Sequence, residues 1–92
     1  MPIAIVLVEI KSGSKLKVLS EALNEIDGVF VTVSVLGVCD IVALIEAKDM
    51  DELKKLVSWH IRSTEGVESL RLLLDIENLE IDTWKELLSK AK

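Results

Sequence analysis

The chain has 92 residues, which suits one small domain and leaves no room for a second. Half of its residues are hydrophobic and 29% are charged, enough for both a core and a solvated surface. The net charge of −5 argues against a nucleic-acid-binding surface, which needs clustered Lys and Arg. A single cysteine, Cys39, excludes an internal disulfide and a multi-cysteine metal cage.

No apolar run is long enough to span a membrane, and the apolar start Ile3–Val8 lacks a basic leader and a cleavage site. We therefore expect a cytoplasmic protein. The absence of Gln and the use of Lys and Glu for charge lean towards a thermophilic source.

The first half of the chain predicts a strand, a helix and a second strand. Ile3–Ile10 is an apolar, β-branched run typical of a strand buried on both faces. Ser14 is a candidate helix N-cap, and Gly28 suits the end of that helix. Val29–Leu36 predicts a strand with its valines on one face and its other residues on the opposite face. The helix is predicted from an apolar stripe: Leu16, Leu19, Leu23 and Ile26.

The second half repeats this plan after a shift of 38 residues, which superposes Ile3 on Ile41 and Gly28 on Gly66. Ile41–Ala47 predicts a third apolar strand, and Val67–Leu74 a fourth. The helix between them is predicted to begin at a capping box of Asp49 and Glu52. Its apolar stripe is Leu53, Leu56, Val57, His60 and Ile61.

The tail predicts a short strand over 76–81 and a last helix from Asp82, with Trp84, Leu87 and Leu88 on one side. The order βαββαβ predicts an α+β, ferredoxin-like sandwich: a four-stranded antiparallel sheet with both helices on one face. We assign the sandwich to residues 1–74 and treat 75–92 as a C-terminal extension of the same domain.

In this fold the first and third strands are central, and here both are apolar on both faces. Two helices cover only one face, so the other would expose a large apolar patch. A second copy of the chain is the favoured cover. The C-terminal helix is the competing one.

For the residues with chemically reactive or metal-binding side chains, a structural role explains the sequence better than a functional one. We interpret His60 as a packed or boundary side chain, because no second His or Cys lies at metal-ligand spacing. Cys39 has no nearby base and suits a small apolar role. Asp49, Asp51 and Glu52 suit the N-terminus of a helix better than a metal site. We find no enzyme signature, no catalytic residues and no sign of a cofactor.

Two features are less fully explained by structure alone. The segment Leu36-Gly37-Val38-Cys39-Asp40 joins two strands and makes a reasonable hairpin turn, yet Asp40 is the one acid that we place at that end of the sheet. Ser69 and Arg71 are polar residues on one face of the fourth strand. They suit an edge strand that discourages aggregation, or a polar site at a subunit interface.

At these residues the sequence resembles the C-terminal effector domain of the Lrp/AsnC (feast/famine) regulators. The run Val33–Ala43 is similar to that family's G-x-(aromatic)-D hairpin, and Glu65–Arg71 is similar to its G-V-x-(S/T) segment. The resemblance covers about Ala4 to Leu74. It departs from the family at Cys39, where an aromatic residue is common, and in starting directly at the first strand, without the helix-turn-helix of full-length members.

The resemblance implies a domain that dimerises through its sheet, assembles further, commonly to octamers, and binds free amino acids between subunits. It implies a ligand site at Leu36, Gly37, Val38, Cys39 and Asp40, with Ser69 as a supporting or neighbouring-subunit donor. The expected partners are copies of the chain, a free amino acid and a full-length regulator of the same family, without direct DNA binding. A ligand-free interaction module and a small dimeric ferredoxin-like enzyme are the alternatives; the single His and absence of Tyr disfavour the enzyme.

Overall fold

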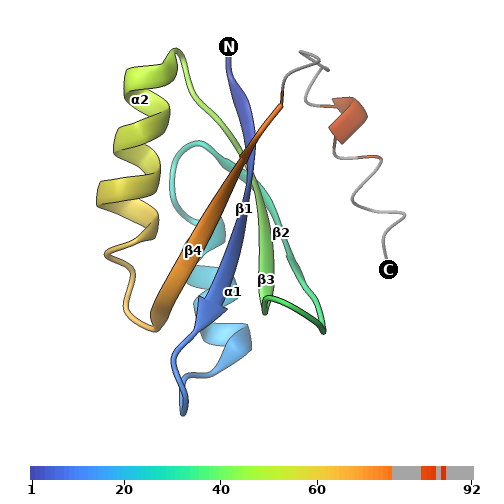
Figure 1. The fold of residues 1–92 in the computed structure, drawn as a ribbon, viewed down its shortest axis with the longest axis vertical. Coiled ribbons are helices and arrows are strands. Elements are labelled where there is room, and N and C mark those ends of the chain that lie inside the picture. Colours follow the sequence, from blue (N-terminus) through green and yellow to red (C-terminus); the bar gives the residue numbers. More distant parts are fainter. Residues whose placement is uncertain (76–81, 85, 87–92) are drawn as a thin grey trace.

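In the computed structural model, which describes residues 1–75, 82–84 and 86, four strands form one antiparallel sheet, and helical segments between the strands pack on one of its faces (Figure 1). The strand order is β2-β3-β1-β4, so that the first and third strands are central, as predicted. The elements are β1 (Ile3–Ile10), α1 (Leu16–Asn24), β2 (Val29–Ser34), β3 (Ile41–Glu46), α2 (Met50–Lys55), the π-helical segment η1 (Leu56–Ile61) and β4 (Val67–Leu74). The ferredoxin-like α+β prediction is confirmed.

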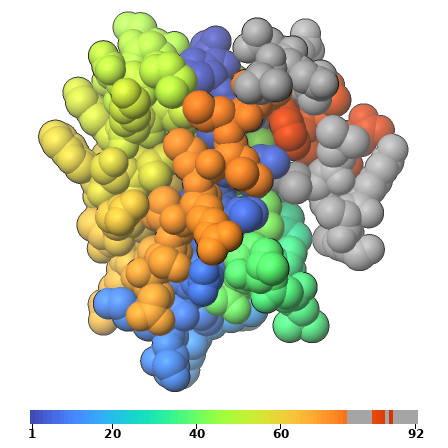
Figure 2. All heavy atoms as spheres, viewed as in Figure 1, coloured from blue at the N-terminus to red at the C-terminus, as the bar shows by residue number. Residues whose placement is uncertain are grey.

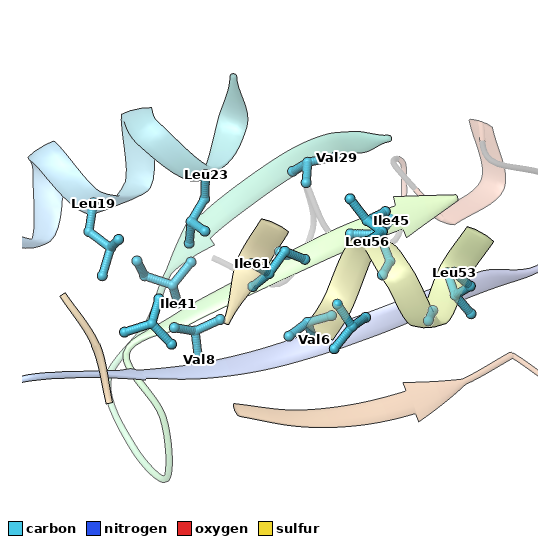
Figure 3. Packing of buried hydrophobic residues seen from close by; sticks show 14 residues of the cluster. Val6, Val8, Leu19, Leu23, Val29, Ile41, Ile45, Leu53, Leu56 and Ile61 are labelled. Carbon is cyan, nitrogen blue, oxygen red and sulfur yellow. The ribbon is translucent and has the colours of Figure 1, made fainter. Parts of the chain in front are cut away.

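The core lies between the sheet and the helices, because apolar side chains of all these layers meet there (Figure 3). β1 and β3 are paired antiparallel, with Val6 opposite Ala43 and Val8 opposite Ile41. Both helices cover the same face of these strands. The helices contribute Leu19, Leu23, Leu53, Leu56, Val57 and Ile61.

The helix starts differ between the two halves. Asp49 caps α2 as predicted: its Oδ1 accepts a hydrogen bond from the backbone N–H of Glu52 at 2.9 Å. The Ser14 prediction is wrong, since α1 has Lys15 as its N-cap residue and no side-chain cap. Ser14 instead belongs to the preceding turn, where its backbone N–H donates to the Lys11 carbonyl.

A β-bulge at Phe30 overturns the prediction that the valines of β2 share one face. Val29 pairs with Ile45 and is buried against the helices, whereas Val31 pairs with Leu44 on the opposite face. The extra residue of a bulge reverses the alternation of side chains beyond it. The strand also ends at Ser34, two residues before Leu36.

His60 is exposed, so its predicted place on the buried stripe is also wrong. The backbone N–H of Arg62 donates to the Val57 carbonyl, five residues earlier, at 3.0 Å. This wider turn holds one more residue than an α-helical turn. Ile61, which is fully buried, therefore takes the inward position that an uninterrupted α-helix would give to His60.

The sheet face away from the helices, which we call the open face, is also apolar. The strand registers place Leu44 opposite Ile5 and Val42 opposite Leu7 on this face. Leu44 is fully buried, whereas Leu73, opposite Ile5 on β4, is 51% exposed. The open face carries Ile5, Leu7, Val31, Val33, Val42, Leu44 and Leu73.

The C-terminal extension returns to the end of β4. Residues 82–84 are helical, as predicted, and the indole Nε1 of Trp84 donates a hydrogen bond to the Asp75 carboxylate at 3.0 Å. The predicted strand over 76–81, together with Leu87 and Leu88, lies outside the described residues. None of the helices in the described part of the chain has the length and the apolar character of a membrane-spanning helix.

Candidate functional site

The hairpin that joins β2 and β3 projects from one end of the sheet, in green at the lower right of Figure 1. At its tip Leu36 is fully exposed and Val38 is 85% exposed. Gly37, between them, has a φ of 144°, a conformation that side-chain-bearing residues rarely adopt, and a Cβ there would meet nothing within 4 Å. The tip is therefore an accessible apolar projection, green in Figure 2, with room above its backbone.

Asp40 joins the base of this hairpin to the end of β1. Its carboxylate Oδ2 accepts a hydrogen bond from the backbone N–H of Ile10 at 2.9 Å. Its own backbone N–H donates to the Val8 carbonyl, and its carbonyl accepts from Val35 N–H, both at 2.9 Å. Asp40 is half-buried, so one carboxylate oxygen is used by the fold while the side chain still reaches the surface.

Cys39 lies inside the hairpin base and is 7% exposed. Burial raises the pKa of its thiol, and the nearby Asp40 and Glu9 carboxylates raise it further. A thiol held in its neutral form is a poor nucleophile. The small apolar role predicted for Cys39 agrees with this environment.

Glu9 was missed by the sequence reasoning, which placed Asp40 as the one acid at this end of the sheet. Both carboxylates act on Cys39, so Glu9 lies at the same end. Neither carboxylate has an ion-pair partner among the described residues. The sequence contained the signal, because antiparallel pairing of β1 with β3 brings the end of β1, where Glu9 lies, to the start of β3, which follows Asp40.

Ser69 and Arg71 lie on the other side of β1. Ser69 is exposed opposite Glu9, and Arg71 is exposed opposite Leu7, so both belong to the open face. With β1 between them, Ser69 and Asp40 are separated by about two strand spacings, roughly 10 Å. They share one end of the sheet, but Ser69 and Asp40 do not converge within one chain.

The described part of the chain contains no group of three or more His, Cys, Asp or Glu side chains arranged to hold a metal ion. It also contains no buried side-chain nitrogen or oxygen that lacks a hydrogen-bond partner.

Comparison with known proteins decides the family. The model of the Lrp/AsnC ligand-binding domain matches residues 3–84. The chain belongs to this family. A comparison with curated proteins finds no match.

Solved structures give the same fold. A Thermus thermophilus protein, TTHA0845, is 38% identical, with a TM-score of 0.78 over 87% of this chain and 99% of the other. The Neisseria meningitidis transcriptional regulator NMB0573, in complex with L-Met, is 15% identical, with a TM-score of 0.76 over 86% of this chain and 52% of its own. AsnC of E. coli is 16% identical, with a TM-score of 0.78 over 87% of this chain and 54% of its own. This Lrp/AsnC domain thus spans about half the length of those two regulators.

Proposed function

We propose that this Lrp/AsnC domain is a non-enzymatic, cytoplasmic sensor of free amino acids that regulates through its state of self-assembly. The observation that carries the proposal is the placement of the Asp40 and Glu9 carboxylates, without an ion-pair partner in the described chain, beside the exposed hairpin tip. An ammonium group is the natural counterpart of such a pair. The Neisseria relative in complex with L-Met supports an amino-acid ligand.

In this proposal the ligand ammonium pairs with the free oxygen of Asp40, whose other oxygen is held by Ile10 N–H. The ligand carboxylate accepts hydrogen bonds from backbone N–H groups near Gly37, where the space above the backbone is open. Leu36 and Val38 supply apolar contact to the ligand or to the neighbouring subunit. Cys39 stays beneath the site and supports the hairpin.

Ser69 enters the site from a neighbouring subunit. Within one chain it stands on the far side of β1 from Asp40, so it does not reach the same small ligand directly. A site shared between subunits makes ligand binding depend on assembly. The ligand then favours the assembled state because it binds that state more tightly.

Assembly itself uses the open face. Its half-exposed Leu73 and the apolar side chains of β1, β2 and β3 make a surface that a second copy would bury. We propose at least a dimer, with larger rings up to an octamer, and a full-length regulator of the same family as a further partner. A ligand-free interaction module is the second candidate, favoured by the full exposure of Leu36 at the hairpin tip.

A thermal-shift screen against the common amino acids separates the two candidates. A ligand that binds only the folded state raises the melting temperature by an amount that grows with its concentration. The sensor predicts such a rise for at least one amino acid, and loss of the rise in Asp40→Asn. A flat screen, combined with capture of a full-length regulator, would favour the interaction module.

A further inference from the structure

A second concave surface, which we call the aromatic groove, lies at the other end of the sheet. It measures about 710 Å³, within the usual range of small-molecule pockets. It lies where β2 begins and β3 ends, whereas the hairpin joins the opposite ends of these strands. Gly28 and Leu56 form its floor: a Cβ at Gly28 would lie 2.9 Å from Leu56 Cδ2.

The fold makes an equivalent groove in its other half. A smaller hollow, about 450 Å³, lies between α1 and the turn at Gly66. Under the 38-residue repeat, Gly66 corresponds to Gly28 and Val18 corresponds to Leu56. Each groove is thus the gap between one helix and the glycine turn that ends the other helix. The hollow alone is a product of the architecture and says nothing about a ligand.

The side chains around the two grooves differ. The aromatic groove is bordered by Trp59, which is 68% exposed, and Phe30, which is 40% exposed. The 38-residue repeat places Glu21 and Glu68 at the positions that correspond to Trp59 and Phe30, and neither of these glutamates lines the smaller hollow. Exposed aromatic side chains are not needed to close a helix–sheet core, and aromatic side chains are enriched where proteins bind partners and ligands.

The helix beside the aromatic groove also has a different backbone conformation from the helix of the first half. Trp59 belongs to the π-helical η1, while α1 in the first half is a regular α-helix. π-helical turns are rare and are frequently found at functional sites. The Ser63 hydroxyl donates to the Trp59 carbonyl, and the Thr64 hydroxyl donates to the His60 carbonyl at 2.7 Å, so the turn is held at its end.

Charges of both signs border the aromatic groove. Glu52 and Lys55 form an ion pair at 3.8 Å. Asp27, Glu46 and Lys48 have no ion-pair partner among the described residues. The groove is also lined by His60 and by Met1, which carries the N-terminal amino group. It therefore combines two aromatic side chains with acidic and basic groups that have no ion-pair partner among the described residues.

We infer that the aromatic groove binds a free aromatic amino acid. The ring lies against Trp59 and Phe30, the ammonium pairs with Asp27 or Glu46, and the carboxylate pairs with Lys48. A zwitterion with a flat apolar side chain matches all three kinds of group, whereas a purely anionic or cationic ligand leaves one sign unpaired. The inference does not depend on the proposed hairpin site, because the two sites share no residue.

The test is a titration of the ¹⁵N-labelled protein with L-phenylalanine, followed by amide chemical shifts. The expected shifts cluster at Gly28, Phe30, Lys48 and the Trp59 indole, and saturate. Trp59→Ala is expected to weaken binding about tenfold, since it removes one ring contact and its buried area. The matched control is Glu21→Ala, at the equivalent exposed position of the first half, which should bind as the parent does.

Two analogues test the head group. Phenethylamine lacks the carboxylate and 3-phenylpropionate lacks the ammonium, so both should bind more weakly than phenylalanine. Equal binding of either would overturn the zwitterion assignment. Asp40→Asn should leave the groove shifts unchanged, which separates this site from the hairpin. The inference would be overturned if the shifts were confined to residues 36–40, or if millimolar phenylalanine caused no shifts. It would also be overturned if the groove shifts followed the protein concentration instead of the ligand concentration, which would assign Trp59 to a contact between copies of the chain.

Discussion

The Asp40 carboxylate accepts a hydrogen bond from the backbone N–H of Ile10, 2.9 Å away and 30 residues earlier in the chain. This bond fixes the base of the hairpin against the end of β1. Asp40 therefore has a structural partner as well as a proposed ligand, and its substitution should have two separable effects.

Asp40→Asn should keep most of the stability, because the amide oxygen can still accept from Ile10 N–H. We expect a loss of about 0.5–1.5 kcal/mol in the free energy of unfolding. Losing the charge-assisted contact to a ligand ammonium should cost about 1.5–3 kcal/mol, or ten- to a hundredfold in affinity. Denaturant melts and calorimetry measure the two effects independently.

The outcome that counts against the site is unchanged affinity in Asp40→Asn for an amino acid that stabilises the parent. Gly37→Val is an unsuitable companion, since the φ of 144° strains any side-chain-bearing residue before ligand contact is considered. Val38→Ala keeps the backbone and tests the apolar contact of the tip.

Gly28→Ala should destabilise the fold more than Gly13→Ala. Both glycines have positive φ, 98° and 88°, so alanine at either carries a backbone penalty of about 1–2 kcal/mol. A Cβ at Gly28 would also approach Leu56 Cδ2 to 2.9 Å and the backbone carbonyl oxygen of Glu46 to 3.1 Å, while one at Gly13 would meet nothing within 4 Å. We expect Gly28→Ala to lose about 1–3 kcal/mol more stability than Gly13→Ala in urea melts. Equal losses would mean that Leu56 and the Glu46 carbonyl both move aside freely.

Leu73→Asp should break assembly through the open face. Leu73 is 51% exposed opposite Ile5, so a carboxylate there would be buried in any sheet-to-sheet contact. Light scattering coupled to gel filtration should give at least twice 10.2 kDa for the parent and 10.2 kDa for the variant. Val18→Asp, at a 61% exposed position on α1, is the control and should stay assembled. A monomeric parent would instead favour the C-terminal extension as the cover of this face.

Cys39 should make stability fall at alkaline pH. Burial and the Asp40 and Glu9 carboxylates raise the pKa of its thiol in the folded state above that in the unfolded chain. Its contribution is therefore full below the unfolded pKa, about 8.5, and is lost as the pH rises through the folded pKa. Denaturant melts between pH 7 and about 10 should show a steeper decline for the parent than for Cys39→Ala. If stability fell equally with pH in the parent and in Cys39→Ala, the pKa of the Cys39 thiol would be the same in the folded and unfolded chain.

The 92-residue chain should show no sequence-specific binding to duplex DNA at physiological salt. Its net charge is −5, and phosphate contacts need clustered cations. Gel shifts with the chain alone should be negative. A supershift that requires a full-length regulator would agree with the proposed partner, and a specific shift by the chain alone would refute the prediction.

The element order βαββαβ predicted that β1 and β3 are central, and the apolar residues on both faces of these two strands agreed with that place. Sequence patterns predicted the Asp49 cap because capping depends on residues three apart. The bulge at Phe30 was missed, since it arises from pairing with β3 and has no local signature. The π-helical turn was missed because Leu53, Leu56, Val57, His60 and Ile61 suit an uninterrupted α-helix equally well; the tight packing of Leu56 on Gly28 is visible only in three dimensions.

The candidate site was predicted in part. The hairpin followed from Gly37 and the strands on either side, whereas the exposure of its tip did not. The bond from Ile10 to Asp40 joins residues 30 apart and needed the register of β1 and β3. The separation of Ser69 from Asp40 likewise depends on which strand lies between them.

The position of β4 at the edge of the sheet, next to β1, affects how the chain folds during synthesis. Ala4 pairs with Leu74, so β1 cannot complete its pairing until nearly the whole domain has been synthesised. Such long-range pairing slows folding. Until residues 67–74 leave the ribosome, one edge of β1 keeps its backbone hydrogen-bonding groups unpaired beside the apolar Val6 and Val8, so the nascent domain is prone to aggregation until β4 joins the sheet.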